Sequence, residues 1–120
     1  MKIIYLLMIM CGLTINTWAS DTKPSEDSII IFKSKTCLPC KMLSKLLQED
    51  DIKIIIKSRF IKHYTIDIDE DHQTTKDYKV GPVPTMIIIR KEHDGVKIID
   101  RQIGFLSRSK LIEWLEKKRE

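Results

Sequence analysis

The apolar residues in the first half of the chain alternate between strand and helix patterns. Residues 28–33 contain four consecutive β-branched or aromatic residues, Ile29 to Phe32, a pattern typical of a strand buried on both faces. From Cys40 to Glu49 the apolar residues recur at helical spacing, and a second short helix is expected to follow through Ile56. This half therefore predicts one buried strand followed by two helical segments.

The second half continues the alternation. We expect a strand over residues 60–68, an acidic turn over 69–72, a short helix over 74–80, strands over 86–89 and 96–102, and a last amphipathic helix that includes Leu111, Trp114 and Leu115. Gly81-Pro82-Val83-Pro84 should be a loop, because proline forbids a helix interior and disfavours a central strand. Asp94-Gly95 indicates a hairpin turn. The predicted order is β-α-β-α-β-β-α, an α/β fold with a central mixed sheet flanked by helices.

The N-terminal segment has the pattern of an export signal. Lys2 supplies a positive charge, residues 3–15 are nearly all apolar, and small residues precede a plausible cleavage point after Ala19. The apolar run is short for a membrane span. We therefore predict an exported, periplasmic protein, with an uncleaved N-terminal anchor facing the periplasm as the alternative. The predicted division is a signal peptide over 1–19, a linker over 20–27 and one domain over 28–120.

Charge and composition narrow the function classes. The 120 residues suit one domain, and the formal net charge is +4 with 32% charged residues. Lysines and arginines are scattered among acidic residues, so we expect no nucleic-acid partner. The acidic stretch Asp67 to Asp71 lacks the glycine and terminal glutamate of a calcium loop, which favours a solvated turn.

The chain has three cysteines, and removal of the signal peptide would take Cys11 with it. The remaining pair, Cys37 and Cys40, forms a Cys-x-x-Cys motif between a predicted strand and a predicted helix. Unsatisfied helix amides and the helix dipole favour a thiolate at the first cysteine. Cys37 is therefore the expected nucleophile and Cys40 the resolving thiol. Pro39 fits the first helical turn, where its missing N–H costs little.

Other uses of the pair stay open at this point. A zinc half-site is one alternative, although no second cysteine pair remains and the three histidines lack finger spacing. A structural disulfide is another, although so small a loop removes little chain entropy. A disulfide oxidase or isomerase, and a binding module without turnover, are two further alternatives. We expect no metal and no cofactor.

Four features of the sequence together resemble the thioredoxin superfamily, in order and in spacing. They are Phe32, the segment Thr36-Cys37-Leu38-Pro39-Cys40-Lys41, the segment Val83-Pro84-Thr85, and Gly104. The resemblance covers residues 28 to 117 and implies a thioredoxin-like fold. Gln102-Ile103-Gly104-Phe105 followed by Leu106-Ser107 is similar to the periplasmic C-terminal domain of the electron-transfer reductase DsbD and to related exported reductases.

The resemblance implies roles for residues around the pair. Pro84 should follow a cis peptide bond facing the dithiol, and the backbone of Val83 should hold a substrate strand. Thr85 and Gly104 would complete the substrate-binding groove, with Gly104 keeping its far side open. The residues that flank the active site are Thr36, Leu38, Pro39 and Lys41, and Lys33, Lys35 and Lys41 add positive charge nearby.

Two positions depart from the family pattern. Thr36 stands where many relatives carry tryptophan, which removes an aromatic cover beside the dithiol. Ile31 stands where thioredoxins of the cytoplasm carry a buried aspartate that assists proton transfer at the second cysteine. No replacement acid is evident, so the tuning of the pair should differ from that of a general thioredoxin.

These observations predict an extracytoplasmic protein-disulfide reductase that exchanges a dithiol with protein disulfides. The expected partners are protein thiols and disulfides and a redox partner, with a membrane protein as a candidate electron donor. We expect a monomer.

Overall fold

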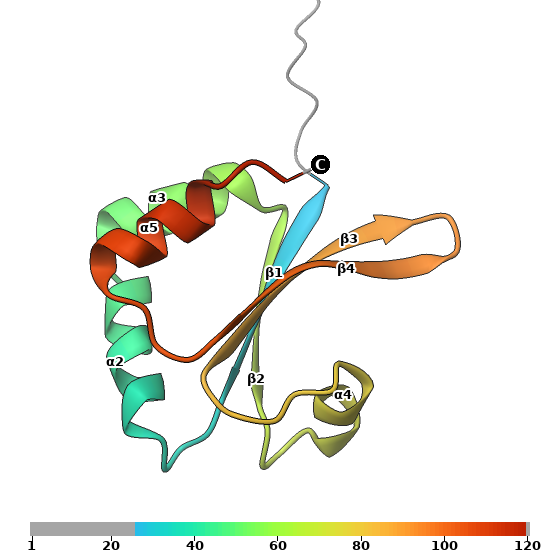
Figure 1. Cartoon of the computed structure of the whole chain (residues 1–120), viewed down its shortest axis with the longest axis horizontal. Coiled ribbons are helices and arrows are strands. Elements are labelled where there is room, and N and C mark those ends of the chain that lie inside the picture. Colours follow the sequence, from blue (N-terminus) through green and yellow to red (C-terminus); the bar gives the residue numbers. More distant parts are fainter. Residues whose placement is uncertain (1–25, 120) are drawn as a thin grey trace, which may run out of the picture.

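The computed structural model describes residues 26–119, which form a four-stranded mixed sheet with helices on both faces (Figure 1). The elements in chain order are β1 (Asp27–Lys33), α2 (Leu38–Leu47), α3 (Asp50–Arg59), β2 (Lys62–Asp67), α4 (His72–Asp77), β3 (Thr85–Glu92), β4 (Gly95–Ile103) and α5 (Arg108–Glu116). The predicted strands and helices are present in the predicted sequence of elements, with α2 and the expected second short helix, α3, together between β1 and β2 where the order β-α-β-α-β-β-α has one helix.

The strands lie in the order β2-β1-β3-β4. Strand β1 pairs in parallel with β2 and antiparallel with β3, and β3 pairs antiparallel with β4. The parallel pair needs a long crossover, which α2 and α3 supply, whereas β3 and β4 form a hairpin. The mixed sheet predicted from the sequence is therefore present.

Strand β1 lies inside the sheet and is buried on both faces, as its continuous apolar run predicts. Ile29 and Ile31 join a large apolar cluster with Leu43, Ile56 and Leu111. Ile30 and Phe32 join a smaller cluster on the opposite face of the sheet. One strand thus anchors both layers of the core.

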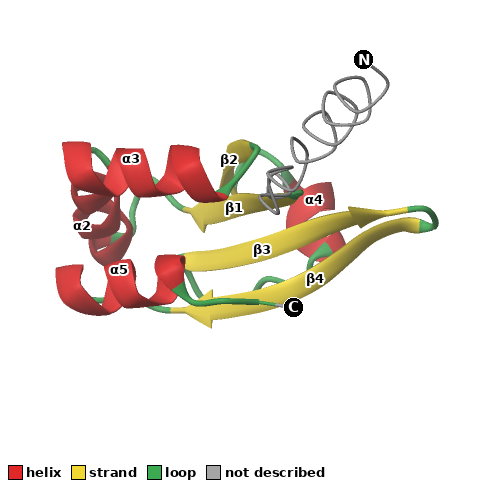
Figure 2. Cartoon of the chain, turned by 90° about the horizontal axis from the view of Figure 1, so that it is seen from above, coloured by secondary structure: helices red, strands yellow, loops and turns green. Residues whose placement is uncertain are grey.

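Helices α2, α3 and α5 cover one face of the sheet and α4 lies against the other (Figure 2). Helix α5 buries Leu111 and Leu115 in the large cluster. Arg108, at its first turn, bonds Glu49 at 3.0 Å and also Asp51, which ties α5 to the start of α3. The face of the sheet that these three helices cover therefore includes α2, the helix at whose start the cysteine pair lies.

Several element boundaries differ from the prediction. Helix α4 begins at His72, within the predicted acidic turn, because Asp71 caps it by accepting a hydrogen bond from the N–H of Thr74 at 3.0 Å. It ends at Asp77, before Lys79, whose φ of 54° does not continue a right-handed helix. The predicted helix over 74–80 is therefore shifted toward the N-terminus.

The β3–β4 hairpin is longer than predicted, because backbone pairing continues beyond the apolar residues. Arg90 pairs with Lys97, and Glu92 pairs with Gly95. The side chains in this outer part of the hairpin are mostly polar, so the sequence had no apolar pattern from which to predict a strand. Helix α3 likewise continues to Arg59, and β2 is shorter than residues 60–68.

The predicted signal peptide over 1–19 and most of the predicted linker lie outside the described residues. Asp27, which we assigned to the linker, is the first residue of β1, and its carboxylate bonds Arg90 of β3 at 2.7 Å. Among residues 26–119, no helix is long and apolar enough to cross a membrane.

Candidate active site

Cys37 lies at the N-cap of α2, directly after the loop that leaves β1. Its backbone is extended, and its Sγ accepts a hydrogen bond from the backbone N–H of Cys40 at 3.2 Å. Leu38 and Pro39 occupy the first two helical positions, where a proline removes no needed donor. The sulfur thus takes the place of a capping oxygen and faces an unsatisfied helix amide. That donor stabilises negative charge on the sulfur.

The two cysteines are joined in a disulfide, with their Cα atoms 5.2 Å apart. Their exposure differs: Cys37 is partly exposed, whereas Cys40 is only 2% exposed. A sulfur that meets solvent can be reached by a second protein, and a buried one can be reached only from within the chain. This difference suits Cys37 to the role of attacking sulfur and Cys40 to that of resolving sulfur.

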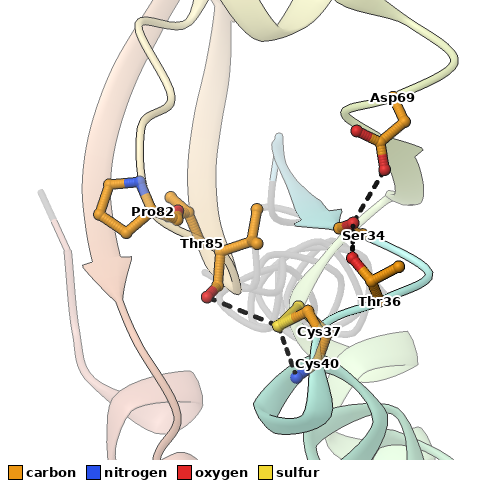
Figure 3. Close-up of a disulfide and its surroundings, with 8 residues drawn as sticks. Ser34, Thr36, Cys37, Cys40, Asp69, Pro82 and Thr85 are labelled. Atoms are coloured by element: carbon orange, nitrogen blue, oxygen red, sulfur yellow. Dashed lines mark hydrogen bonds between the residues drawn. A yellow bond between two sulfur atoms is a disulfide. The ribbon is translucent and has the colours of Figure 1, made fainter.

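The loop before β3 faces Cys37, as Figure 3 shows. The Sγ of Cys37 lies 3.7 Å from the backbone carbonyl oxygen of Val83. The peptide bond between Val83 and Pro84 is cis. The structure therefore brings together the two segments that the resemblance to thioredoxins assigned to one site, although 46 positions separate them in the sequence.

Two hydrogen bonds hold this loop in place. The hydroxyl of Thr85, which is 1% exposed, donates to the carbonyl oxygen of Pro82 at 2.6 Å. The backbone N–H of Gly104 donates to the carbonyl oxygen of Pro84 at 2.8 Å. Thr85 therefore has a structural contact inward rather than a free polar group directed at a substrate.

Gly104 has a φ of +92°, a backbone conformation that is strained for any residue with a side chain. An added Cβ would meet no atom within 4 Å, so the backbone conformation, and not crowding, calls for glycine here. Its role in keeping a substrate groove open stays a prediction.

The residues that flank the pair are mostly exposed. Leu38 is 68% exposed and Met42 is 45% exposed, and Thr36 and Lys41 also face solvent. On the α2 side, exposed apolar side chains and the charge of Lys41 therefore surround the dithiol together. The charge of Lys35 is offset by Glu70, whose carboxylate accepts a hydrogen bond from its Nζ at 2.7 Å and raises the pKa of Lys35.

Sequence reasoning missed a polar link that supports the loop before Cys37. The hydroxyl of Ser34 donates to the carboxylate of Asp69 at 2.8 Å and lies 3.3 Å from the hydroxyl of Thr36 (Figure 3). Ser34 is 8% exposed, and its carbonyl oxygen accepts from the N–H of Cys37 at 3.3 Å. The 35 positions between Ser34 and Asp69 leave no local signal from which to predict the pair.

The family model described as Thioredoxin matches residues 10–117 of this chain. The chain belongs to the thioredoxin family. Proteins of this family are thiol–disulfide oxidoreductases, and this chain carries their Cys-x-x-Cys pair.

Individual thioredoxins agree with the family match. The chain is 31% identical to thioredoxin of Bacillus subtilis (strain 168) over 86 residues, which covers 72% of this chain and 76% of that protein. It is 32% identical to a thioredoxin of Staphylococcus aureus over 89 residues, with coverage of 74% and 79%.

Among solved structures, a thioredoxin from Thermus thermophilus superposes with a TM-score of 0.65 at 18% identity, covering 75% of this chain and 71% of that one. Trichomonas vaginalis thioredoxin superposes with a TM-score of 0.61 at 22% identity, with coverage of 75% and 77%. These superpositions confirm the thioredoxin-like fold.

The two departures from the thioredoxin pattern have structural counterparts. Ile31 is 3% exposed and belongs to the large apolar cluster. Among residues 26–119 the buried polar side chains are Ser28, Ser34 and Thr85, so the described part of the chain has no buried carboxylate. At Thr36, a small hydroxyl side chain lies within hydrogen-bond distance of the Ser34 hydroxyl.

Proposed function

We propose that this thioredoxin-family protein reduces protein disulfides outside the cytoplasm, with Cys37 as nucleophile and Cys40 as resolving thiol. The observation that carries the proposal is the contrast within the pair: Cys37 is partly exposed and its sulfur faces a helix N–H at 3.2 Å, whereas Cys40 is buried. An accessible, stabilised thiolate beside a sequestered second thiol suits two-step exchange with a large substrate.

In the first step, the Cys37 thiolate attacks one sulfur of a substrate disulfide. A bond forms between Cys37 and that sulfur, and the other substrate sulfur leaves as a thiolate. In the second step, the Cys40 thiolate attacks the Cys37 sulfur and releases the substrate as a dithiol. Two electrons have then passed to the substrate, and the Cys37–Cys40 disulfide must be reduced by a separate dithiol partner, for which a membrane protein is the proposed class.

The loop that faces Cys37 is the proposed binding site for the substrate. The Val83 carbonyl oxygen lies 3.7 Å from the attacking sulfur, and the Pro84 carbonyl oxygen is already bound to the N–H of Gly104. The backbone of Val83 would pair with an extended substrate segment and bring its disulfide to Cys37. Leu38 and Met42 would contact apolar side chains of that segment.

Reduction of the disulfides of insulin by the full chain, with a chemical dithiol as electron source, tests the chemistry. Cys37→Ser should remove all activity above the uncatalysed rate, whereas the control Cys11→Ser should retain it because it leaves the pair intact. Unchanged activity in Cys37→Ser would reject the mechanism. No activity above the uncatalysed rate in the unaltered chain would favour a binding module without turnover.

Cys40→Ser provides a second test, because it blocks only the second step. A mixed disulfide with the substrate should then accumulate through Cys37 and persist on non-reducing gels. Its absence, despite an alkylatable Cys37, would reject the assignment of Cys40 as the resolving thiol.

The direction of exchange follows from the reduction potential, which equilibration with glutathione measures. A reductase should have a potential of about −270 mV, close to that of thioredoxin, whereas a potential of about −120 mV would reverse the proposed direction and favour an oxidase. The proposed relationship to the C-terminal domain of DsbD, based on the resemblance of residues Gln102 to Ser107, also predicts that exchange runs in the reducing direction.

The extracytoplasmic location rests on the apolar N-terminal segment. Expression of the full chain in a bacterium, followed by cell fractionation and mass measurement, should find the protein in the periplasm and cleaved after Ala19. An uncut chain in the membrane fraction would support the anchored alternative, and an uncut chain in the cytoplasm would overturn the proposed location.

A further inference from the structure

A groove of about 570 Å3 lies between the helices α2 and α3 and the strands β1 and β2. Its floor is apolar and belongs to the large core cluster, through Ile31, Leu47, Ile56 and Phe60. Ile61, the residue before β2, also lines it and is 57% exposed. Neither cysteine lines this groove, so it is a surface separate from the dithiol.

The rim of the groove carries positive charge. Lys33, Lys53, Lys57 and Lys62 line it, and no aspartate or glutamate does. Within residues 26–119, none of these four lysines takes part in an ion pair. Their combined charge equals the whole formal excess of +4 of the chain. Partial desolvation lowers the pKa of the neighbouring His63, which leaves that ring neutral at pH 7.

The spacing of the lysines indicates how many negative charges the groove can meet. Lys62 pairs with Ser28 and Lys33 pairs with Asp67, so the two lysines are five residue pairs apart along the parallel strands and stand on opposite faces in the strand alternation, with Lys62 at the edge of the groove. At about 3.3 Å per residue this separation is roughly 17 Å. Lys53 and Lys57 are one turn apart on α3, or about 6 Å along its axis. A single carboxylate or phosphate cannot reach all four charges.

An extended peptide fits both properties of the groove. Alternate residues of an extended chain point to opposite sides, so acidic side chains can meet the lysines while apolar ones contact the floor. Strand β2 is also the edge strand of the sheet in the described part of the chain, and its outer backbone groups can pair with an added strand.

We propose that this groove binds an extended acidic segment of a partner protein that alternates carboxylates with apolar residues. Such docking is an interaction distinct from exchange at the dithiol, and it positions a partner on the β2 side of the molecule. It requires no redox step, so its test does not depend on the activity of the cysteine pair.

The test is binding of a fluorescent ten-residue peptide that alternates glutamate with leucine, measured by fluorescence anisotropy with the full chain. The double variant Lys53→Glu and Lys57→Glu should weaken binding at least tenfold, because it replaces two attractions by two repulsions. Raising the salt concentration from about 0.01 M to about 1 M should weaken binding to the unaltered protein, because the Debye length falls from about 30 Å to about 3 Å.

The matched control is Lys97→Glu with Lys110→Glu, which changes net charge equally at two exposed lysines outside the groove. It should bind the peptide within about twofold of the unaltered protein. Equal weakening in the two double variants would overturn the proposal, because the effect would then be one of net charge. Equal binding of a glutamine-for-glutamate peptide would overturn it as well.

A membrane surface is the rival occupant, and vesicles of phosphatidylglycerol provide its test. If the double variant at Lys53 and Lys57 loses vesicle binding but keeps peptide binding, the groove recognises a lipid surface and the proposal is wrong. Retained insulin reduction in either double variant is expected, because none of these lysines belongs to the dithiol site.

Discussion

At the scale of single residues, the two cysteines differ because of where the chain places them. Cys37 precedes the first helical residue, so its sulfur receives a helix amide, whereas Cys40 is one turn later and turns into the core. The Cys-x-x-Cys spacing made this asymmetry predictable, since a helix beginning at the first cysteine buries one side of its first turn. The environment that holds Cys37 in place was less predictable, because it depends on distant residues.

Ser34 is the residue through which that distant support acts. Ser34→Ala should lower the free energy of unfolding by about 1 kcal/mol, because it removes the hydrogen bond to Asp69 from a buried hydroxyl. Urea unfolding of the oxidised protein measures the loss. Ser58→Ala is the matched control, because its hydroxyl bonds an exposed helix carbonyl, and it should stay within about 0.5 kcal/mol.

A double-mutant cycle separates the bond from other effects of the substitutions. Asp69→Ala should lose a similar amount, and the variant carrying both changes should lose little more than either alone. If the two losses simply add, Ser34 and Asp69 do not act as a pair, and the loop before Cys37 is held by other contacts.

At the scale of elements, helix α4 shows how a short helix depends on its cap. Its six residues contain no buried side chain, so packing contributes little to holding it helical. Asp71 accepts hydrogen bonds from both the N–H and the hydroxyl of Thr74, at 3.0 and 2.7 Å. The sequence placed Asp71 in an acidic turn because three neighbouring acids obscured its capping role.

The cap predicts a pH dependence. The hydrogen bonds from Thr74 lower the pKa of Asp71 below its usual 3.8, so the ionised carboxylate favours the folded state. This contribution is fully present above pH 3.8 and is lost as the pH falls through the lowered pKa of the folded state. Asp71→Ala should therefore reduce Tm at pH 7, and its difference from the unaltered protein should shrink as the pH falls below 3.8.

Thermal denaturation followed by circular dichroism at a series of pH values measures this difference. Glu113→Ala is the control, because Glu113 is exposed on α5 and has no ion pair in the described part of the chain. It should give a small difference without the same acid dependence. A constant difference between Asp71→Ala and the unaltered protein down to the acid limit would contradict the capping argument.

At the scale of the whole molecule, the sequence predicts those features that burial imposes on the pattern of apolar and polar residues. The run Ile29 to Phe32 identified a central strand, and the dithiol with the later Val83-Pro84-Thr85 identified two parts of one site. The outer half of the β3–β4 hairpin escaped prediction because backbone pairing there joins exposed polar residues such as Lys91 and Glu92. Contacts between residues far apart in the sequence, such as Ser34 with Asp69, produce no periodic pattern from which they could be predicted.

The two apolar clusters lie on opposite faces of the sheet and share its strands, which bears on how the molecule unfolds. Met86 belongs to the large cluster and Ile87 to the smaller one, yet they are consecutive residues of β3, and both are fully buried. Because adjacent residues of a strand point to opposite faces, loss of either cluster must disrupt the same backbone pairing with β1. The clusters should therefore not unfold separately.

Met86→Ala and Ile87→Ala test this coupling. Each should lower the free energy of unfolding by about 2–5 kcal/mol, because each leaves a cavity in a packed layer. Differential scanning calorimetry should show one transition in both variants, with equal calorimetric and van't Hoff enthalpies. Ile98→Ala, at a side chain that is 42% exposed on β4, should cost about 1 kcal/mol or less. Two resolved transitions in Ile87→Ala would mean that the α4 layer unfolds by itself, against the expectation from the shared strand.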